Sequence, residues 1–301
     1  MSDAVAKLAQ SLEARRTPDG GFAAVPGGSP DSESTALVAL ARHALAADAG
    51  REAAHWLAAR QRADGAWPFT DAVPEPSWAS AWAALALART GAGAEPLVRA
   101  AGWLVAREGR RPGLVARALG RLTHQDERLE QDLTLEGWPW HEAAASWVEP
   151  TASALLALRV LAERAPVVGA RERIQEGERL LWDRVCVNGG WNYGNRRVLG
   201  EALEPFPDTT AFALLALQGS ARRAALAESC AALEALLDEK ASSLALALGA
   251  LALELHARGA EPLRARLEEH IERAGPPRET RSVAFALLAL GGGAELLRAP
   301  S

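Results

Sequence analysis

The sequence predicts an all-α protein in which about six helical hairpins form an (α/α)6 toroid, with an inner and an outer ring of helices. Two observations support this fold. A phrase rich in alanine and leucine recurs six times, and a segment with charge on one face precedes each copy. Signals for β-strands are nearly absent. The 301-residue chain is 49% hydrophobic and 24% charged, so it is long and apolar enough to build a packed core.

The recurring phrase opens with an acidic or hydroxyl side chain and ends in a run that resembles Leu-Ala-Leu. Its apolar residues lie all round the helix, which is typical of a helix that is buried on every side. We therefore assign these segments to the inner ring. The six copies span residues 34–45, 80–90, 151–162, 210–219, 243–255 and 282–291.

The preceding segments are amphipathic and are assigned to the outer ring. They span residues 4–16, 51–62, 95–108, 171–185, 221–237 and 261–274. One such helical pair cannot bury its own apolar face, so each pair must stack on its neighbours. We expect a single domain over residues 1–301, with an insertion at about 111–137. Residues 113–122 of this insertion have a helical pattern, so a seventh pair or an extra helix stays open as an alternative.

A second signature, WLAARQRADGAW, lies between the outer and inner helices of the second unit, at residues 56–67. Its Leu57, Gln61, Gly65 and Trp67 have the spacing of the QW repeat of squalene-hopene and oxidosqualene cyclases. Residues 12–22 and 181–191 resemble this repeat more weakly. The chain thus resembles the α/α toroids of the terpene cyclase and prenyltransferase superfamily, as a member with one helical domain. We expect Gln61 to cap backbone groups of a neighbour, Gly65 to permit a tight turn and Trp67 to cover the joint.

Three predicted inner helices begin with an acid two residues before Thr-Ala, namely Glu33, Glu149 and Asp208. In a toroid, the N-termini of the inner helices converge at one end of a central cavity. Class II terpene cyclases carry an Asp-x-Asp-Asp-Thr-Ala motif there, and the resemblance implies that Asp208 is the proton donor. Phe206 and Thr209 stand in place of the other two acids of that motif. Glu149 is then a second catalytic carboxylate and Glu33 a substrate contact. The alternative is that these acids only cap the helix N-termini.

Aromatic residues gather near the same helix starts, in a chain with ten Trp, five Phe and one Tyr. We predict that they line a pocket for an apolar ligand, and the alternative is that they are packing residues like Trp67. Phe285 is a further inner-helix aromatic for which both interpretations apply. The predicted ligand contacts are Trp82, Trp138, Trp140, Trp147, Trp191, Tyr193 and Phe212.

The resemblance implies a terpene cyclase-like protein that binds an isoprenoid or another apolar ligand, and acid-initiated cyclisation or isomerisation as its reaction. One alternative is a non-catalytic toroid that binds a ligand or a protein. A second is a six-hairpin carbohydrate-active enzyme that uses Glu149 and Asp208 as paired carboxylates. The sequence leaves open whether the chain is an enzyme and whether a partner chain supplies a second domain.

Charge and composition exclude several other classes. A formal net charge of -5 with no basic stripe argues against nucleic acid as a partner. Cys186 and Cys230 have no CxxC spacing, so we expect free thiols, no metal site and no cofactor. The N-terminal segment lacks the apolar core of a secretion signal, and no stretch is apolar enough to span a membrane. We therefore expect a cytoplasmic protein, and contact with a membrane surface stays open.

Overall fold

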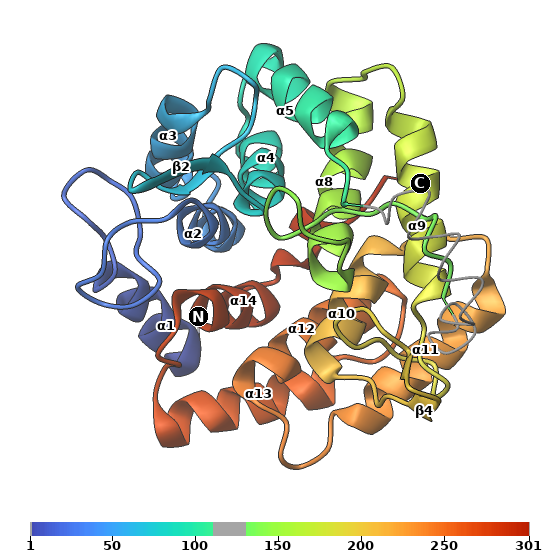
Figure 1. The fold of residues 1–301 in the computed structure, drawn as a ribbon. Helices are drawn as coiled ribbons and strands as arrows, with labels where there is room; N and C mark the ends of the chain where they lie inside the picture. Colours follow the sequence, from blue (N-terminus) through green and yellow to red (C-terminus); the bar gives the residue numbers. More distant parts are fainter. Residues whose placement is uncertain (1, 111–130, 301) are drawn as a thin grey trace.

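The computed structural model describes residues 2–110 and 131–300, and its helices form two concentric layers (Figure 1). In this part of the chain, six helices make a closed inner ring in which each helix contacts the next and the last returns to the first. The predicted (α/α)6 toroid is confirmed. In chain order the inner helices are α2 (Ser32–Leu45), α4 (Ala79–Thr90), α8 (Val148–Arg164), α10 (Pro207–Ala216), α12 (Ser243–Leu255) and α14 (Thr280–Leu290).

The inner helices are buried on all sides, as their sequence pattern predicts. In α4, every residue from Ala79 to Ala88 is buried, and most of them are alanine or leucine. The small alanine side chains let neighbouring helices approach closely, and the leucines fill the space between them. Burying one leucine side chain contributes about 1.5 to 3 kcal/mol, so these helices carry much of the stability of the fold.

Outer helices pack against the ring from outside. Helix α3 lies on α2, α9 on α8 and α13 on α12, whereas α1 lies on α14 and so joins the first unit to the last. Arg15 strengthens this closure, because its Nη2 donates hydrogen bonds of 2.9 Å to the carbonyl oxygens of Pro277 and Arg278. The outer helices are α1 (Asp3–Glu13), α3 (Arg51–Arg60), α5 (Ala94–Ala106), α9 (Ala170–Asp183), α11 (Arg223–Leu236) and α13 (Glu261–Ala274).

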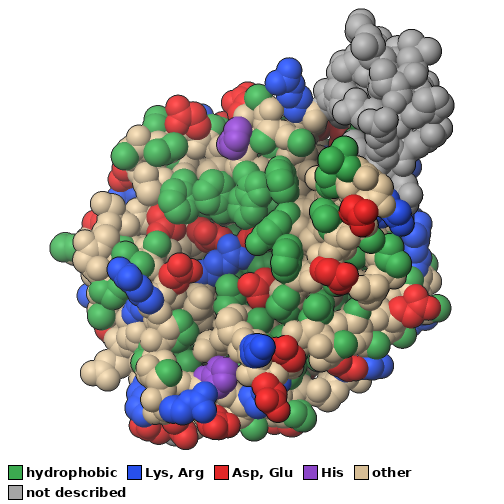
Figure 2. Space-filling model, turned by 60° about the horizontal axis from the view of Figure 1, so that its bottom comes forward, with side chains coloured by type: hydrophobic (Ala, Val, Ile, Leu, Met, Phe, Trp, Pro, Cys, Tyr) green, Lys and Arg blue, Asp and Glu red, His purple; other side chains and the backbone are tan. Residues whose placement is uncertain are grey.

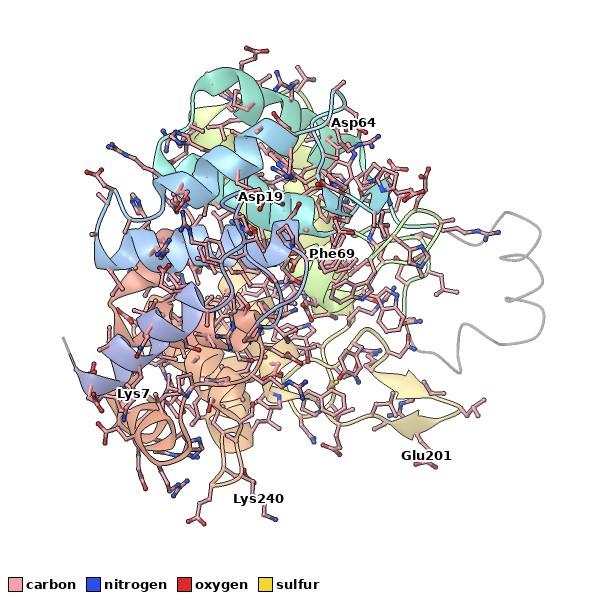
Figure 3. All side chains as sticks on the ribbon, turned by 90° about the vertical axis from the view of Figure 1, so that its left-hand side faces the viewer. Lys7, Asp19, Asp64, Phe69, Glu201 and Lys240 are labelled. Atoms are coloured by element: carbon pink, nitrogen blue, oxygen red, sulfur yellow. The ribbon has the colours of Figure 1, made fainter. Side chains whose placement is uncertain are left out.

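Two short antiparallel hairpins interrupt the helical pattern, and the sequence pattern did not predict them. Strands β1 (Pro68–Thr70) and β2 (Val73–Pro76) precede α4, and β3 (Arg197–Val198) and β4 (Glu201–Ala202) precede α10. Figure 3 shows Phe69 of the first hairpin near the middle of the view, Glu201 of the second hairpin at the lower right and Lys7 at the lower left. Both hairpins belong to loops that lead into the N-termini of inner helices.

The QW-like segment makes the contacts expected of a joint between units. Gln61 Nε2 donates hydrogen bonds to the carbonyl oxygens of Gly65 (3.1 Å) and Pro96 (2.8 Å), and Pro96 belongs to the next outer helix, α5. Gly65 has a φ of 93°, which favours glycine. The indole N–H of Trp67 donates to the Leu57 carbonyl oxygen at 2.8 Å. The expected structural roles of Gln61, Gly65 and Trp67 are confirmed by these contacts.

The C-terminal segment covers the end of the ring at which the inner helices finish. A 3-10 helix, η1 (Gly293–Leu297), contacts α2, α12 and α14. Gln218, just after α10, donates from Nε2 to the Leu297 carbonyl oxygen at 2.9 Å and accepts from the Ala299 N–H at 3.1 Å. Since Leu297 is fully buried, the tail closes this end of the ring. The functional side chains must therefore be sought at the opposite end.

The helix expected at residues 113–122 lies outside the described residues, so the alternative of a seventh pair stays a prediction. The single-domain assignment also stays a prediction. Within residues 2–110 and 131–300, no helix has both the length and the apolar character needed to cross a bilayer.

Candidate functional site

Charged side chains meet at the end of the ring where the inner helices begin. Glu33, Glu149, Asp208 and Arg281 are each the second residue of an inner helix, in α2, α8, α10 and α14 respectively. Arg281 forms ion pairs with Glu33, at 3.4 Å from Nη1 to Oε1, and with Glu149 through Nη2. These three side chains are 22%, 13% and 14% exposed, respectively. We call these four residues the mouth cluster.

A shared local structure explains why the acids stand in equivalent places. Two residues after each acid, a threonine hydroxyl accepts a hydrogen bond from a loop backbone N–H. The Thr151 hydroxyl accepts from the Trp138 N–H at 3.0 Å, and the Thr210 hydroxyl accepts from the Trp191 N–H at 2.9 Å. Thr35 bonds Phe22 in the same way, at 2.9 Å. The threonine of the acid-x-Thr-Ala pattern thus fixes the helix start against the joint, and the acid one half-turn earlier lies at the mouth.

In the described residues, none of these three acids provides the capping hydrogen bond of its helix, although each lies in the first turn, where the helix dipole favours an acid. The residue that caps α2 is Asp31, whose Oδ1 accepts the Ser34 N–H at 2.7 Å. Helices α8 and α10 begin without a side-chain cap, and Glu149 and Asp208 lie inside the first turn. A capping side chain belongs to the residue that precedes the helix, so the second helical position does not provide this bond.

Sequence reasoning missed Arg281, because only acids were sought at the helix starts. A signal was present: aligning TRSVAF (residues 280–285) with PDTTAF (207–212) puts Arg281 in the position of Asp208. A cation in the first turn opposes the helix dipole, and the two glutamates offset this cost. Burial lowers the pKa of Arg281, but Glu149 and Glu33 outweigh it and raise the pKa overall.

Burial changes the proton affinity of two acids in the mouth cluster. Desolvation raises the pKa of Glu33 to about 6, although Arg281 opposes this change. Desolvation also raises the pKa of Asp208, with Arg281 again opposing and Glu149 adding to the rise. In the described part of the chain Asp208 forms no ion pair, and its Oδ1 is buried without a hydrogen-bond partner. Asp208 is therefore the acid in the cluster whose carboxyl is not engaged by Arg281.

An aromatic layer lies one helical turn below the mouth cluster. Trp82, Phe212 and Phe285 come from α4, α10 and α14, which alternate with other helices around the ring. Their rings meet edge to face with centroids 5.6 to 6.1 Å apart, so they contact one another across the ring centre. All three are at most 2% exposed. The predicted ligand contacts Trp82 and Phe212 thus form the floor beneath the cluster.

Other aromatic residues surround the mouth. In the loops before α4 and α8, Trp78 stacks on Phe69 at 4.9 Å between ring centroids and meets Trp140 edge-on at 5.3 Å. Tyr193 lies 5.1 Å from Phe206 in the loop before α10. Figure 2 shows one face of the molecule on which hydrophobic side chains form a continuous stretch beside acidic and basic side chains. The most exposed rings are Trp147 (37%), Phe206 (44%) and Tyr193 (56%).

Two predicted ligand contacts belong to the joints instead of the mouth. Trp138 is 2% exposed and Trp191 is fully buried. The indole N–H of Trp138 donates to the Leu104 carbonyl oxygen at 2.9 Å, and that of Trp191 donates to Leu181 at 2.6 Å. Both repeat the contact of Trp67, so we place them among the packing residues.

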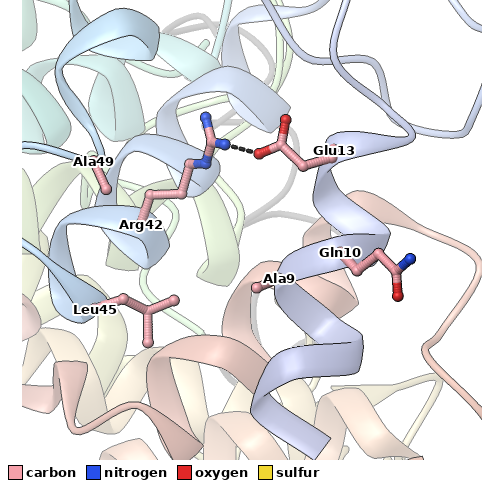
Figure 4. Close-up of a pocket in the computed structure, with 6 residues that line it drawn as sticks. All are labelled: Ala9, Gln10, Glu13, Arg42, Leu45 and Ala49. Atoms are coloured by element: carbon pink, nitrogen blue, oxygen red, sulfur yellow. Dashed lines mark ion pairs between the residues drawn. The ribbon is translucent and has the colours of Figure 1, made fainter. Parts of the chain in front are cut away.

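In the described residues, a small cavity is lined by the predicted ligand contact Trp138 together with Trp78 and Pro150, whereas three larger grooves include none of the predicted site residues. A groove of about 330 Å³ lies between α1 and the end of α2, with an ion pair between Glu13 and Arg42 at its edge (Figure 4). Its walls are Ala9, Gln10, Leu45 and Ala49 together with that pair.

The described residues include no group of three or more His, Cys, Asp or Glu side chains arranged to hold a metal ion. Cys186 and Cys230 are free and buried. Burial raises the pKa of both thiols, for Cys230 to about 11, which opposes the thiolate form needed for nucleophilic attack.

Solved structures with the same fold include terpene cyclases and glycoside hydrolases. The type II terpene cyclase MstE from Scytonema is 15% identical with a TM-score of 0.63, and the alignment covers 98% of both chains. The ent-copalyl diphosphate synthase from Streptomyces platensis is 19% identical with a TM-score of 0.59, over 87% of this chain and 50% of that one. An α-1,6-mannanase, GH76A, from Salegentibacter sp. is 12% identical with a TM-score of 0.62, over 98% and 99%.

No protein-family model and no curated protein matches the chain. The solved structures therefore establish the α/α toroid, which terpene cyclases and glycoside hydrolases share, and leave the activity to be argued from the site.

Proposed function

We propose that the mouth of the ring binds an isoprenoid and that Asp208 protonates an alkene of this ligand, which starts a cyclisation or an isomerisation. One observation carries the proposal: the Asp208 carboxyl is not paired with Arg281, whereas Glu33 and Glu149 are, and its Oδ1 is buried without a partner. In this role Asp208 is the proton donor, and Glu149 is a second carboxylate whose negative charge helps to raise the pKa of Asp208.

The environment of Asp208 suits this chemistry. An acid that protonates an alkene must be held in its protonated form, and burial raises the pKa of Asp208 in that direction. Transfer of the Asp208 proton forms a C–H bond and leaves a carbocation on the substrate. The rings of Trp82 and Phe285 below the cluster can attract a cation, whereas the Phe212 ring already faces the Arg281 guanidinium. In a cyclisation, attack of an internal alkene on the cation forms a C–C bond and moves the positive charge to another carbon. In both reactions, loss of a proton from a carbon next to the final cation forms an alkene, and this proton returns to the Asp208 carboxylate.

The exposed rings of Trp147, Tyr193 and Phe206 support entry of an apolar ligand from this side. Contact of the same rim with a membrane surface, or with a second chain that completes the site, stays a prediction. So does a cytoplasmic location.

Product analysis tests the proposal. The purified protein is incubated with isoprenoids of about 15 to 30 carbons, chosen because the aromatic walls recognise apolar alkenes, and the extract is analysed by gas chromatography and mass spectrometry. We expect cyclised or isomerised product with the wild type and none with Asp208→Asn. Asp48→Asn is the matched control, because Asp48 is exposed and distant from the mouth. Equal yields from Asp208→Asn and the wild type would exclude Asp208 as the acid.

A second candidate is a carbohydrate-active enzyme, and two features support it: paired carboxyl groups and exposed aromatic rings. Carboxyl groups of Glu149 and Asp208 share one mouth with exposed aromatic rings, and such rings stack on sugar faces. The mannanase from Salegentibacter has been solved with α-1,6-mannotriose, so this sugar is a suitable probe. Release of mannose that is lost in Glu149→Gln would favour this candidate over the isoprenoid proposal. If the protein binds a ligand but forms no product with either class, it is a non-catalytic binding toroid.

A further inference from the structure

We propose that Arg281 is the positioning residue of this site, because it pairs with Glu33 and Glu149 and leaves Asp208 as the one acid of the mouth cluster that can transfer a proton. The inference rests on the proposed role of Asp208.

The geometry places Arg281 across the mouth. In the closed ring α14 is next to α2, which carries Glu33, and is opposite α8, which carries Glu149. One guanidinium therefore joins a neighbouring helix to the opposite helix. Its central carbon also lies 4.9 Å from the centroid of Phe212, one turn after Asp208 on α10. Arg281 is thus fixed on three sides, and Asp208 lies beside it without an ion pair.

The balance of charge explains why this arrangement matters. Three acids and one base occur at the second positions of four inner helices, and Ser80 of α4 and Leu244 of α12 occupy this position in the other two. Two further acids precede inner helices: Asp31 caps α2 through the Ser34 N–H, and Glu279 precedes α14. Without Arg281, three neighbouring carboxyls would share protons among themselves, as like-charged pairs do. The transferable proton would then no longer belong to Asp208.

Arg281 also makes Asp208 a stronger acid. Its positive charge favours the carboxylate and so opposes the effect of burial on the pKa of Asp208. Loss of this charge should bind the proton more tightly, which slows its transfer to an alkene and at the same time keeps Asp208 protonated to higher pH.

A titration of Asp208 tests the inference without any substrate. The protein is labelled with ¹³C at the aspartate side-chain carboxyl, and the Asp208 signal is assigned by its loss in Asp208→Asn. We expect Arg281→Gln to lower the acid dissociation constant of Asp208 by about tenfold or more, the usual effect of removing an opposite charge at short range. Arg278→Gln is the matched control, because Arg278 is exposed just before α14, and it should leave the titration unchanged. An unchanged Asp208 titration in folded Arg281→Gln would overturn the inference.

A second variant covers the case in which Arg281→Gln does not fold because two buried glutamates lose their partner. Arg281→Lys keeps the charge but lacks the planar fork that holds two carboxylates at once. We expect Arg281→Lys to keep the Asp208 titration close to that of the wild type, because the charge remains, and to lower turnover, because one ammonium cannot hold both glutamates. An Asp208 titration that shifts in folded Arg281→Lys would show that the charge of Arg281 does not set the acidity of Asp208. Wild-type-like turnover and pH profile in Arg281→Lys would contradict a positioning role.

The two proposals fail in different ways. If Arg281→Gln changes the Asp208 titration but the wild type forms no isoprenoid product, the positioning of the carboxyls stands and the isoprenoid function is refuted. If the wild type forms isoprenoid product but the Asp208 titration is unchanged in Arg281→Gln, the isoprenoid function stands and the positioning role of Arg281 is refuted.

Discussion

Replacing Glu33 with glutamine should change how the stability of the fold depends on pH. Burial raises the pKa of Glu33 from 4.5 to about 6, so the folded protein binds this proton more tightly than the unfolded chain does. The stability that Glu33 contributes is therefore complete below about pH 4.5 and is lost as the pH rises through 6. This change in pKa corresponds to about 2 kcal/mol.

The assay is urea unfolding of the wild type and Glu33→Gln at several pH values between 4 and 8. We expect the wild type to lose about 2 kcal/mol of unfolding free energy relative to the variant across this range, because glutamine does not titrate. Glu201→Gln, an exposed position on β4, is the control and should give a flat difference. A wild type that gains stability relative to Glu33→Gln as the pH rises would refute the reasoning, since the ion pair with Arg281 would then outweigh burial.

Two further predictions concern the joints, and both are measured by urea unfolding. Gly91→Ala, at a φ of 91° with open space around it, should cost about 1 to 2 kcal/mol from backbone strain alone. Gly65→Ala, at a φ of 93°, should cost more than about 3 kcal/mol, because its Cβ would also overlap a backbone carbonyl of α5. Equal losses of unfolding free energy in Gly65→Ala and Gly91→Ala would contradict the close approach of α5 to Gly65. Trp67→Phe removes a buried hydrogen bond and volume and should cost about 2 to 4 kcal/mol, against less than about 1 kcal/mol for Trp147→Phe at the exposed rim. A comparable cost at both tryptophans would argue against the joint role of Trp67.

Local patterns account for what could be predicted. Long runs rich in alanine and leucine predict that the inner helices are buried on all sides. A charged face opposite an apolar face predicts that the outer helices are half-buried, so both rings could be identified from the sequence. The joint residues Gln61, Gly65 and Trp67 act within a short segment, and their contacts agree with the expectation. The short hairpins before α4 and α10 have no alternating pattern long enough to predict them.

The mouth cluster shows where sequence reasoning ended. Glu33, Glu149 and Asp208 were selected because each precedes Thr-Ala, and the sequence could not show that Asp31, before α2, provides the capping hydrogen bond of that helix in place of Glu33. Trp138 and Trp191 were selected as ligand contacts from their crowding, and only their burial and indole hydrogen bonds show that they pack the joints.

The amino-acid sequence by itself determined the helical units, their division into buried and half-buried sets, and the presence of an acid at three helix starts. These properties depend on periodicity and on contacts between near neighbours in the chain. The tertiary structure decided which acids are paired, because Arg281 stands 248 residues from Glu33 and 132 residues from Glu149. Only closure of the ring brings α14 beside α2 and opposite α8. The distinction between two engaged glutamates and one free aspartate follows from that closure.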